Sequence, residues 1–120
     1  MLTINEAQLE AFQDISIEMF KSRMISFLTE FFFDAIENQS EFELKMFIAN
    51  SIEKAEAFGI DTEDDVQAFI VYAVQLGINF DTKHSWAAKV LNNDNLLGSE
   101  KLEQLDLMIP TQYPTFVFHN

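Results

Sequence analysis

Residues 19–36, MFKSRMISFLTEFFFDAI, decide the fold class, because an apolar residue recurs there every three or four positions. That interval is the repeat of one face of an α-helix. Thr3 and Glu6 form a capping-box pair that starts a helix, and neither Gly nor Pro interrupts the chain before Asn38-Gln39. The pattern predicts one long first helix. Its apolar stripe comprises Leu9, Phe12, Phe20, Met24, Phe27, Leu28 and Phe31, widened by Met19, Phe32, Phe33 and Ile36.

Further helices are expected at the following caps and stops. Ser40 pairs with Glu43 as a second capping box, and Gly59 ends the helix that follows. A third helix is expected from Thr62 to Gly77, a short one over residues 86–91 and a last one capped by Ser99. In the second helix, apolar residues at helical intervals are Phe42, Phe47, Ile48, Ile52, Ala55 and Phe58. Most Phe residues at such intervals are expected to lie in the core.

The stretch from Gly77 to Trp86 is predicted to be a structured loop. Trp86 is expected to anchor the loop in the core, and Asp81 is expected to hold its backbone. The expected anchors of the loop are Gly77, Phe80, Asp81 and Trp86.

The end of the chain is expected to leave the helical pattern. Pro110 and Pro114 disfavour helix, and the run that contains Phe116 and Phe118 is extended and apolar. We predict an all-α protein, a compact bundle of four to five helices over residues 1–109 with an extended aromatic tail at 110–120. The tail either folds back over the helices or offers a strand to a partner.

The composition excludes several classes of protein. A chain of 120 residues has the size of one domain, and its 13 Phe residues separate it from disordered sequences. It contains no Cys, which excludes disulfides, thiolate zinc sites and a Cys nucleophile. We see neither a signal peptide nor an apolar run of about 20 residues, and therefore expect a cytoplasmic protein.

The charge of the chain favours a protein partner. Twenty acidic and seven basic residues give a formal net charge of −13. Such a surface repels nucleic-acid phosphates and anionic membranes, whereas it attracts a basic protein. Alternatively, the charge serves only to keep a Phe-rich chain in solution. Whether the chain forms a homodimer stays open.

No catalytic or metal-binding pattern stands out. The carboxylates of Asp61, Glu63, Asp64 and Asp65 lack the central Gly and closing Glu of an EF-hand and suit the start of a helix. His84 and Asp81 have a spacing that fits two metal ligands, but no further ligands can be named. Nucleophile elbows and phosphate-binding glycine loops are also missing. We expect a protein that is not an enzyme and has no cofactor or metal.

The aromatic residues suggest where a partner binds. A single buried stripe cannot cover three consecutive aromatic side chains on a helix, so part of the run at 31–33 must be buried by a neighbouring element, a second subunit or a partner protein. An apolar surface bordered by carboxylates is typical of a protein-binding site. The predicted binding residues are Phe31, Phe32, Phe33, Asp61, Glu63, Asp64, Asp65, Phe116 and Phe118.

The order of short motifs resembles a family of small acidic helical proteins encoded beside spike and effector genes of bacterial type VI secretion systems. The similarity lies in Ala57-Phe58-Gly59-Ile60, Glu63-Asp64-Asp65-Val66, Leu76-Gly77, Phe80-Asp81, Trp86-Ala87 and Val90-Leu91, with the Met1–Ile4 start and the Lys101–Leu105 segment. It spans roughly residues 1–108. The resemblance implies an adaptor or co-chaperone that binds a secreted effector, or its chaperone, for loading. The alternative is an immunity protein that binds and neutralises a toxin.

Overall fold

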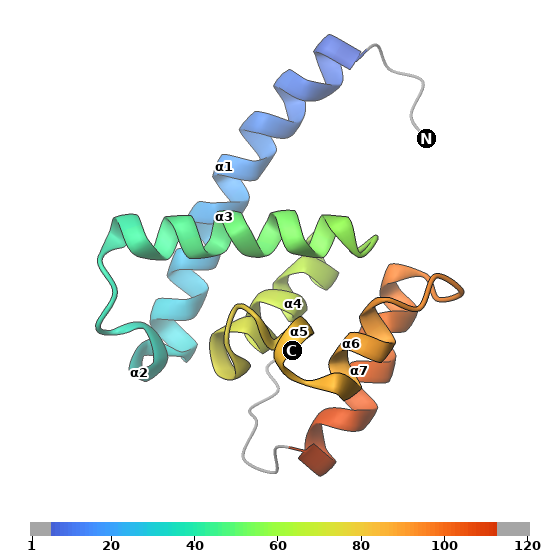
Figure 1. The fold of residues 1–120 in the computed structure, drawn as a ribbon. Helices are drawn as coiled ribbons and strands as arrows, with labels where there is room; N and C mark the ends of the chain where they lie inside the picture. The colour runs from blue at the N-terminus through green and yellow to red at the C-terminus, as the bar shows by residue number, and fades with distance from the viewer. Residues whose placement is uncertain (1–5, 113–120) are drawn as a thin grey trace. The chain divides into compact units, whose positions relative to one another are not determined.

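Between residues 6 and 112, the part of the chain whose backbone the computed structural model describes, the protein is helical and contains no strand. Side chains are described for residues 17–109. The helices in chain order, labelled in Figure 1, are α1 (Glu6–Phe31), α2 (Phe33–Ile36), α3 (Glu41–Ala57), α4 (Glu63–Leu76), α5 (Phe80–Lys83), α6 (Ser85–Leu91) and α7 (Gly98–Gln112). The all-α prediction is confirmed for this part of the chain. None of these helices is long and apolar enough to cross a membrane.

Between residues 6 and 112 the chain forms seven helices, whereas four or five were expected. Five of the seven correspond to the expected ones, and the two additional helices, α2 and α5, have four residues each. The chain divides into two units, residues 1–46 and residues 47–120, with the boundary inside α3.

The first unit contains a break at Phe32 that the sequence did not predict. Phe32 has φ −135° and ψ 34°, outside the helical region, and it separates α1 from α2. The buried side chains Phe20, Met24, Leu28, Phe32 and Ile36 follow one another every four residues. In a straight helix this repeat advances about 40° around the axis at each step. The break changes the direction of the chain, and Phe32 and Ile36 both remain buried.

The caps of α3 form as their sequences predict. At its start, the Ser40 backbone N–H donates to the Glu43 carboxylate at 2.8 Å, and the Glu43 N–H donates to the Ser40 hydroxyl at 3.1 Å. At its end, Gly59 adopts φ +81°, which a residue with a side chain rarely does. The Ile60 N–H bonds the Ala55 carbonyl at 2.9 Å, and this pairing defines a Schellman motif. Thr3 of the other capping pair lies outside the described residues.

The start of α7 is fixed by a close contact between two backbones in the second unit. A Cβ atom at Gly98 would lie 2.2 Å from the Gly59 carbonyl oxygen, so only glycine fits there. The helix begins at Gly98, before the Ser99 that was expected to cap it. The capping group is the Glu100 carboxylate, which accepts from the Leu97 N–H at 2.8 Å. Lys101 then donates to the Phe58 carbonyl at 2.9 Å, at the end of α3.

The other end of α7 also differs from expectation. The helix continues through Pro110 to Gln112, although Pro110 was expected to end it. Ile109, just before the proline, is fully buried, which keeps the end of the helix in the core. The tail residues 113–120 lie outside the described part of the chain.

A chain of aromatic rings forms the core of the second unit. The ring of Phe69 lies 6.3 Å from that of Phe58 and 5.2 Å from that of Phe80, and Tyr72 meets Phe80 edge-on at 6.3 Å. Offset and edge-on pairs at these distances are favourable arrangements for aromatic rings. They join the end of α3, α4 and α5 into one core.

The contact between Gly98 and Gly59 yields a first prediction. Gly98→Ala should lower the free energy of unfolding by about 2–3 kcal/mol, because the new methyl group overlaps a backbone carbonyl that has little room to move. Ser99→Ala, a change in the same helical turn at an exposed position, is the matched control. Urea unfolding followed by circular dichroism measures both. If Gly98→Ala is as stable as Ser99→Ala, the close contact does not exist.

Candidate functional site

The large apolar side chains that remain exposed are concentrated in the first unit. Among the residues whose side chains are described, they are Met19, Phe31, Phe33, Phe42, Met46, Leu97 and Leu107. Five of these seven lie between residues 19 and 46. Single exposed apolar residues are common on protein surfaces, whereas several in one short stretch of chain make that stretch a candidate for binding. Residues 31–46, which contain four of them, are the candidate site.

The aromatic run at 31–33 is divided between the core and the surface. Phe31 and Phe33 are exposed, by 42% and 54%, whereas Phe32 is buried. Phe31 also packs on Phe27, with 5.1 Å between the ring centroids, and Phe27 lies 6.0 Å from Phe32. The predicted binding role is therefore wrong for Phe32, whose side chain belongs to the core. Phe31 and Phe33 form what we call the aromatic corner.

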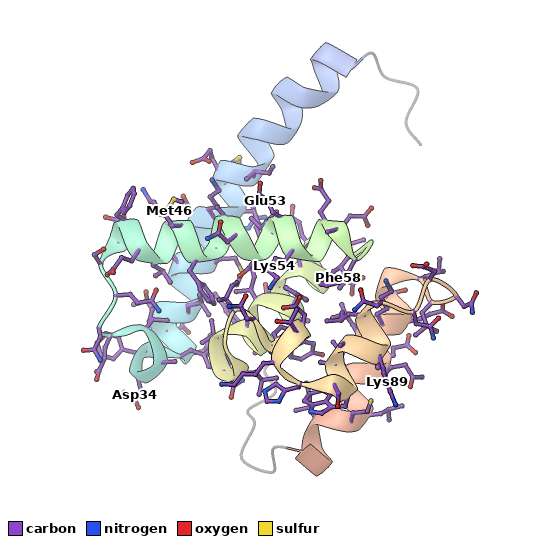
Figure 2. All side chains as sticks on the ribbon, in the orientation of Figure 1. Asp34, Met46, Glu53, Lys54, Phe58 and Lys89 are labelled. Carbon is purple, nitrogen blue, oxygen red and sulfur yellow. The ribbon has the colours of Figure 1, made fainter. Side chains whose placement is uncertain are left out.

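A second exposed pair lies at the start of α3, and we call it the α3 face. Phe42 is 73% exposed and Met46, labelled in Figure 2, is 47% exposed. The prediction that Phe42 is buried is wrong. Its helical phase could have shown this, because Phe42 stands two positions, or about 200°, before the buried Leu44. Met46 follows Phe42 by four residues and therefore shares its face.

Carboxylates are frequent in the stretch of chain that carries both apolar pairs. Between residues 30 and 46 there are five acidic residues and one lysine, a formal charge of −4. The only described ion pair among them joins Lys45 to Glu41 at 3.9 Å. All five carboxylates are on exposed residues, namely Glu30, Asp34, Glu37, Glu41 and Glu43. Asp34 projects from α2 in Figure 2. The site is therefore apolar and acidic at once.

The acidic residues that were predicted to bind a partner lie instead in the second unit, at the start of α4. Asp61, Glu63 and Asp64 are exposed, while Asp65 is half-buried and its backbone N–H donates to the Thr62 hydroxyl at 3.3 Å. This is the helix cap that the sequence predicted, and the negative charges suit the positive end of the helix dipole. No group of three His, Asp or Glu side chains among the described residues could hold a metal ion.

The rest of the predicted binding surface stays a prediction. It joined residues 31–33 to Asp61, Glu63, Asp64 and Asp65, and these two sets belong to different units. Phe116 and Phe118 lie outside the described residues.

The four predicted loop anchors behave differently from one another. Gly77 ends α4 with φ +103°, and Phe80 is fully buried. Trp86 is only half-buried and stacks on His84 at 5.7 Å, so the prediction that it anchors the loop in the core is wrong. Phe80 is the aromatic anchor instead. The expected loop also contains the short helix α5.

Asp81 is held by Lys54, labelled in Figure 2, and not directly by the loop backbone. The Lys54 Nζ donates to the Asp81 carboxylate at 2.6 Å and to the Ile78 carbonyl at 2.9 Å. It also donates to the Asn79 side chain at 3.3 Å. The Asp81 side chain is 8% exposed, and that of Lys54 is 27% exposed. One ammonium group from α3 therefore satisfies three acceptors around α5.

This ion pair yields a second prediction. Lys54→Met should lower the free energy of unfolding by about 3 kcal/mol, because it leaves the Asp81 carboxylate buried without its partner. Adding Asp81→Leu should restore most of the loss, since neither charge then remains. Lys89→Met, at an exposed lysine of α6, is the control, and thermal unfolding gives the comparison. Equal stability of the Lys54 and Lys89 variants would show that the pair contributes nothing.

A buried tyrosine connects α4 to α7. The Tyr72 hydroxyl donates to the Asp106 carboxylate, and the tyrosine ring is 2% exposed. Burial raises the pKa of Tyr72 well above its usual range, and the hydrogen bond to Asp106 and the charge of that carboxylate raise it further. The folded protein therefore keeps Tyr72 neutral at a pH where the unfolded chain ionises it.

The raised pKa of Tyr72 yields a third prediction. Above about pH 10, the pKa of an unperturbed tyrosine, the unfolded chain loses a proton that the folded protein retains. The free energy of unfolding should then fall by about 1.4 kcal/mol for each further pH unit on account of this residue. Tyr72→Phe should lack that component while losing about 1 kcal/mol at neutral pH through the missing hydrogen bond. Parallel pH dependences in the two proteins would contradict the assignment.

Comparisons with known proteins give no relative from which a role for the site could be taken. No protein-family model, no curated protein and no solved structure matches the chain.

Proposed function

We propose that the protein is a non-catalytic binding module that acts in the cytoplasm on another protein. The observation that supports this most is the exposure of Phe33 and Phe42 beside carboxylates in residues 31–46. An aromatic side chain that is exposed to water in the free protein contributes favourable free energy when a partner covers it. Aromatic residues also contribute much of the binding energy at protein interfaces.

The more specific proposal is an adaptor or co-chaperone that binds a type VI secretion effector, or its chaperone, for loading. It rests on the resemblance of the motifs between Ala57 and Leu91 to proteins of that kind. An acidic adaptor suits a basic effector segment, because complementary charge accelerates association. The second candidate, an immunity protein, uses the same complementarity but blocks the toxin's active site.

A pull-down from cells that express the neighbouring genes separates the two roles. Recovery of an effector with a spike component or second chaperone, with the effector still toxic, is the result expected of an adaptor. Recovery of a toxin whose activity is abolished would replace the adaptor by an immunity protein. Recovery of neither would contradict both roles.

The fourth prediction assigns the binding to the candidate site. The double variant Phe33→Ser, Phe42→Ser should lose about 2 kcal/mol or more of binding free energy for the recovered partner, since aromatic anchors dominate such interfaces. Leu107→Ser is the matched control, because Leu107 is 72% exposed, close to the 73% of Phe42, and lies in the second unit. Calorimetric titration gives the affinity of the wild type, the double variant and the control for that partner. Equal affinities would remove residues 31–46 from the interface.

A further inference from the structure

The chemistry of the α3 face indicates what kind of partner segment it binds. We propose that Phe42 and Met46 receive a basic amphipathic α-helix of the partner protein, an inference that rests on the proposed binding function. Three properties of the described residues support it, namely the spacing of the two side chains, the absence of a strand, and the sign of the charge.

The spacing of the two side chains suits a helix. Phe42 and Met46 are four residues apart on α3, so their side chains lie one above the other on one face, about 6 Å apart. A row of this kind fits between the apolar side chains that a partner helix presents at three- and four-residue intervals. The thioether of Met46 is flexible and adapts to side chains of different shape.

The backbone also favours a helix over a strand. Between residues 6 and 112 the chain contains no strand, so this region offers no sheet edge to which an extended segment could add. A segment that is buried against helical side chains must satisfy its own N–H and C=O groups. An α-helix does this within itself.

The charge selects a basic segment. Glu41 and Glu43 flank Phe42, and the pairing of Glu41 with Lys45 at 3.9 Å is long and exposed. Lysine or arginine at the border of the partner helix would meet these carboxylates. A second copy of the chain would instead bring a formal charge of −13 against another −13, which opposes association.

The test uses a synthetic helical peptide of about 18 residues, with Leu on one face and Lys on the other, so that its apolar stripe has the helical repeat. Fluorescence anisotropy measures its binding to the full-length protein. We expect Phe42→Ser and Met46→Ser each to weaken binding by about tenfold, the effect of losing an anchoring side chain, and Leu107→Ser to leave it unchanged.

Charge variants complete the test. Glu41→Lys should weaken binding and flatten its dependence on salt, whereas Glu103→Lys on α7 should have less effect, because Glu103 is exposed and lies in the second unit. The same peptide with Glu in place of Lys should not bind. Glu41 is chosen over Glu43 because the Glu43 carboxylate also caps α3.

Several outcomes would overturn the inference. Equal binding by Phe42→Ser and wild type would show that the peptide is held by charge alone. A dimer of the wild-type protein in sedimentation, absent in Phe42→Ser, would identify a second copy as the occupant. A further outcome is that the peptide fails to bind the wild-type protein although the Phe33→Ser, Phe42→Ser double variant no longer binds the partner recovered from cells. In that case this inference fails and the proposed function stands. If the peptide fails to bind and the double variant binds the recovered partner as tightly as wild type does, this inference and the assignment of the binding site both fail.

Discussion

The contact between the Gly59 carbonyl and Gly98 is the constraint on which the second unit depends. The left-handed conformation of Gly59 ends α3, and the missing side chain of Gly98 lets α7 begin against that end. Lys101, one turn further along α7, then bonds the Phe58 carbonyl and lies over the Phe58 ring at 5.8 Å. Its positive charge suits the negative end of the α3 dipole. The helix end is thus satisfied by a neighbouring helix.

Lys54 performs a similar task one turn earlier on α3. It holds Asp81 and the Ile78 carbonyl, which places Phe80 in the aromatic core beside Phe69. Two of the four lysines in residues 47–120 are therefore used inside the unit, while that stretch contains eleven acidic residues. The formal charge that remains outside is strongly negative, as a protein that attracts basic partners requires.

The sequence predicted the features that depend on neighbouring residues. The Ser40–Glu43 box, the Gly59 stop, the Thr62 cap and the Gly77 stop each involve side chains within a few positions, and all four form. One feature that it missed depends on distant residues. Nothing near Gly98 in the chain reveals that Gly59 lies against it.

The candidate site was predictable in part from the helical repeat of the sequence. Three consecutive Phe residues cannot share one helical stripe, and two of them are indeed exposed. Which one is buried depends on the break at Phe32, which the sequence pattern did not show. Phe42 was expected in the core because it was grouped with the apolar residues that recur at helical intervals, although its phase relative to the buried Leu44 places it outside.

The most direct test of the central claim is photo-cross-linking in living cells, with a photoreactive phenylalanine analogue at position 33, 42, 97 or 107 in turn. All four positions are exposed and apolar, and only the first two lie in the candidate site. We predict that positions 33 and 42 give a cross-link to the same protein, and that positions 97 and 107 do not. Cross-links of equal yield at all four positions, or at 97 and 107 alone, would contradict the assignment of the binding surface to residues 31–46.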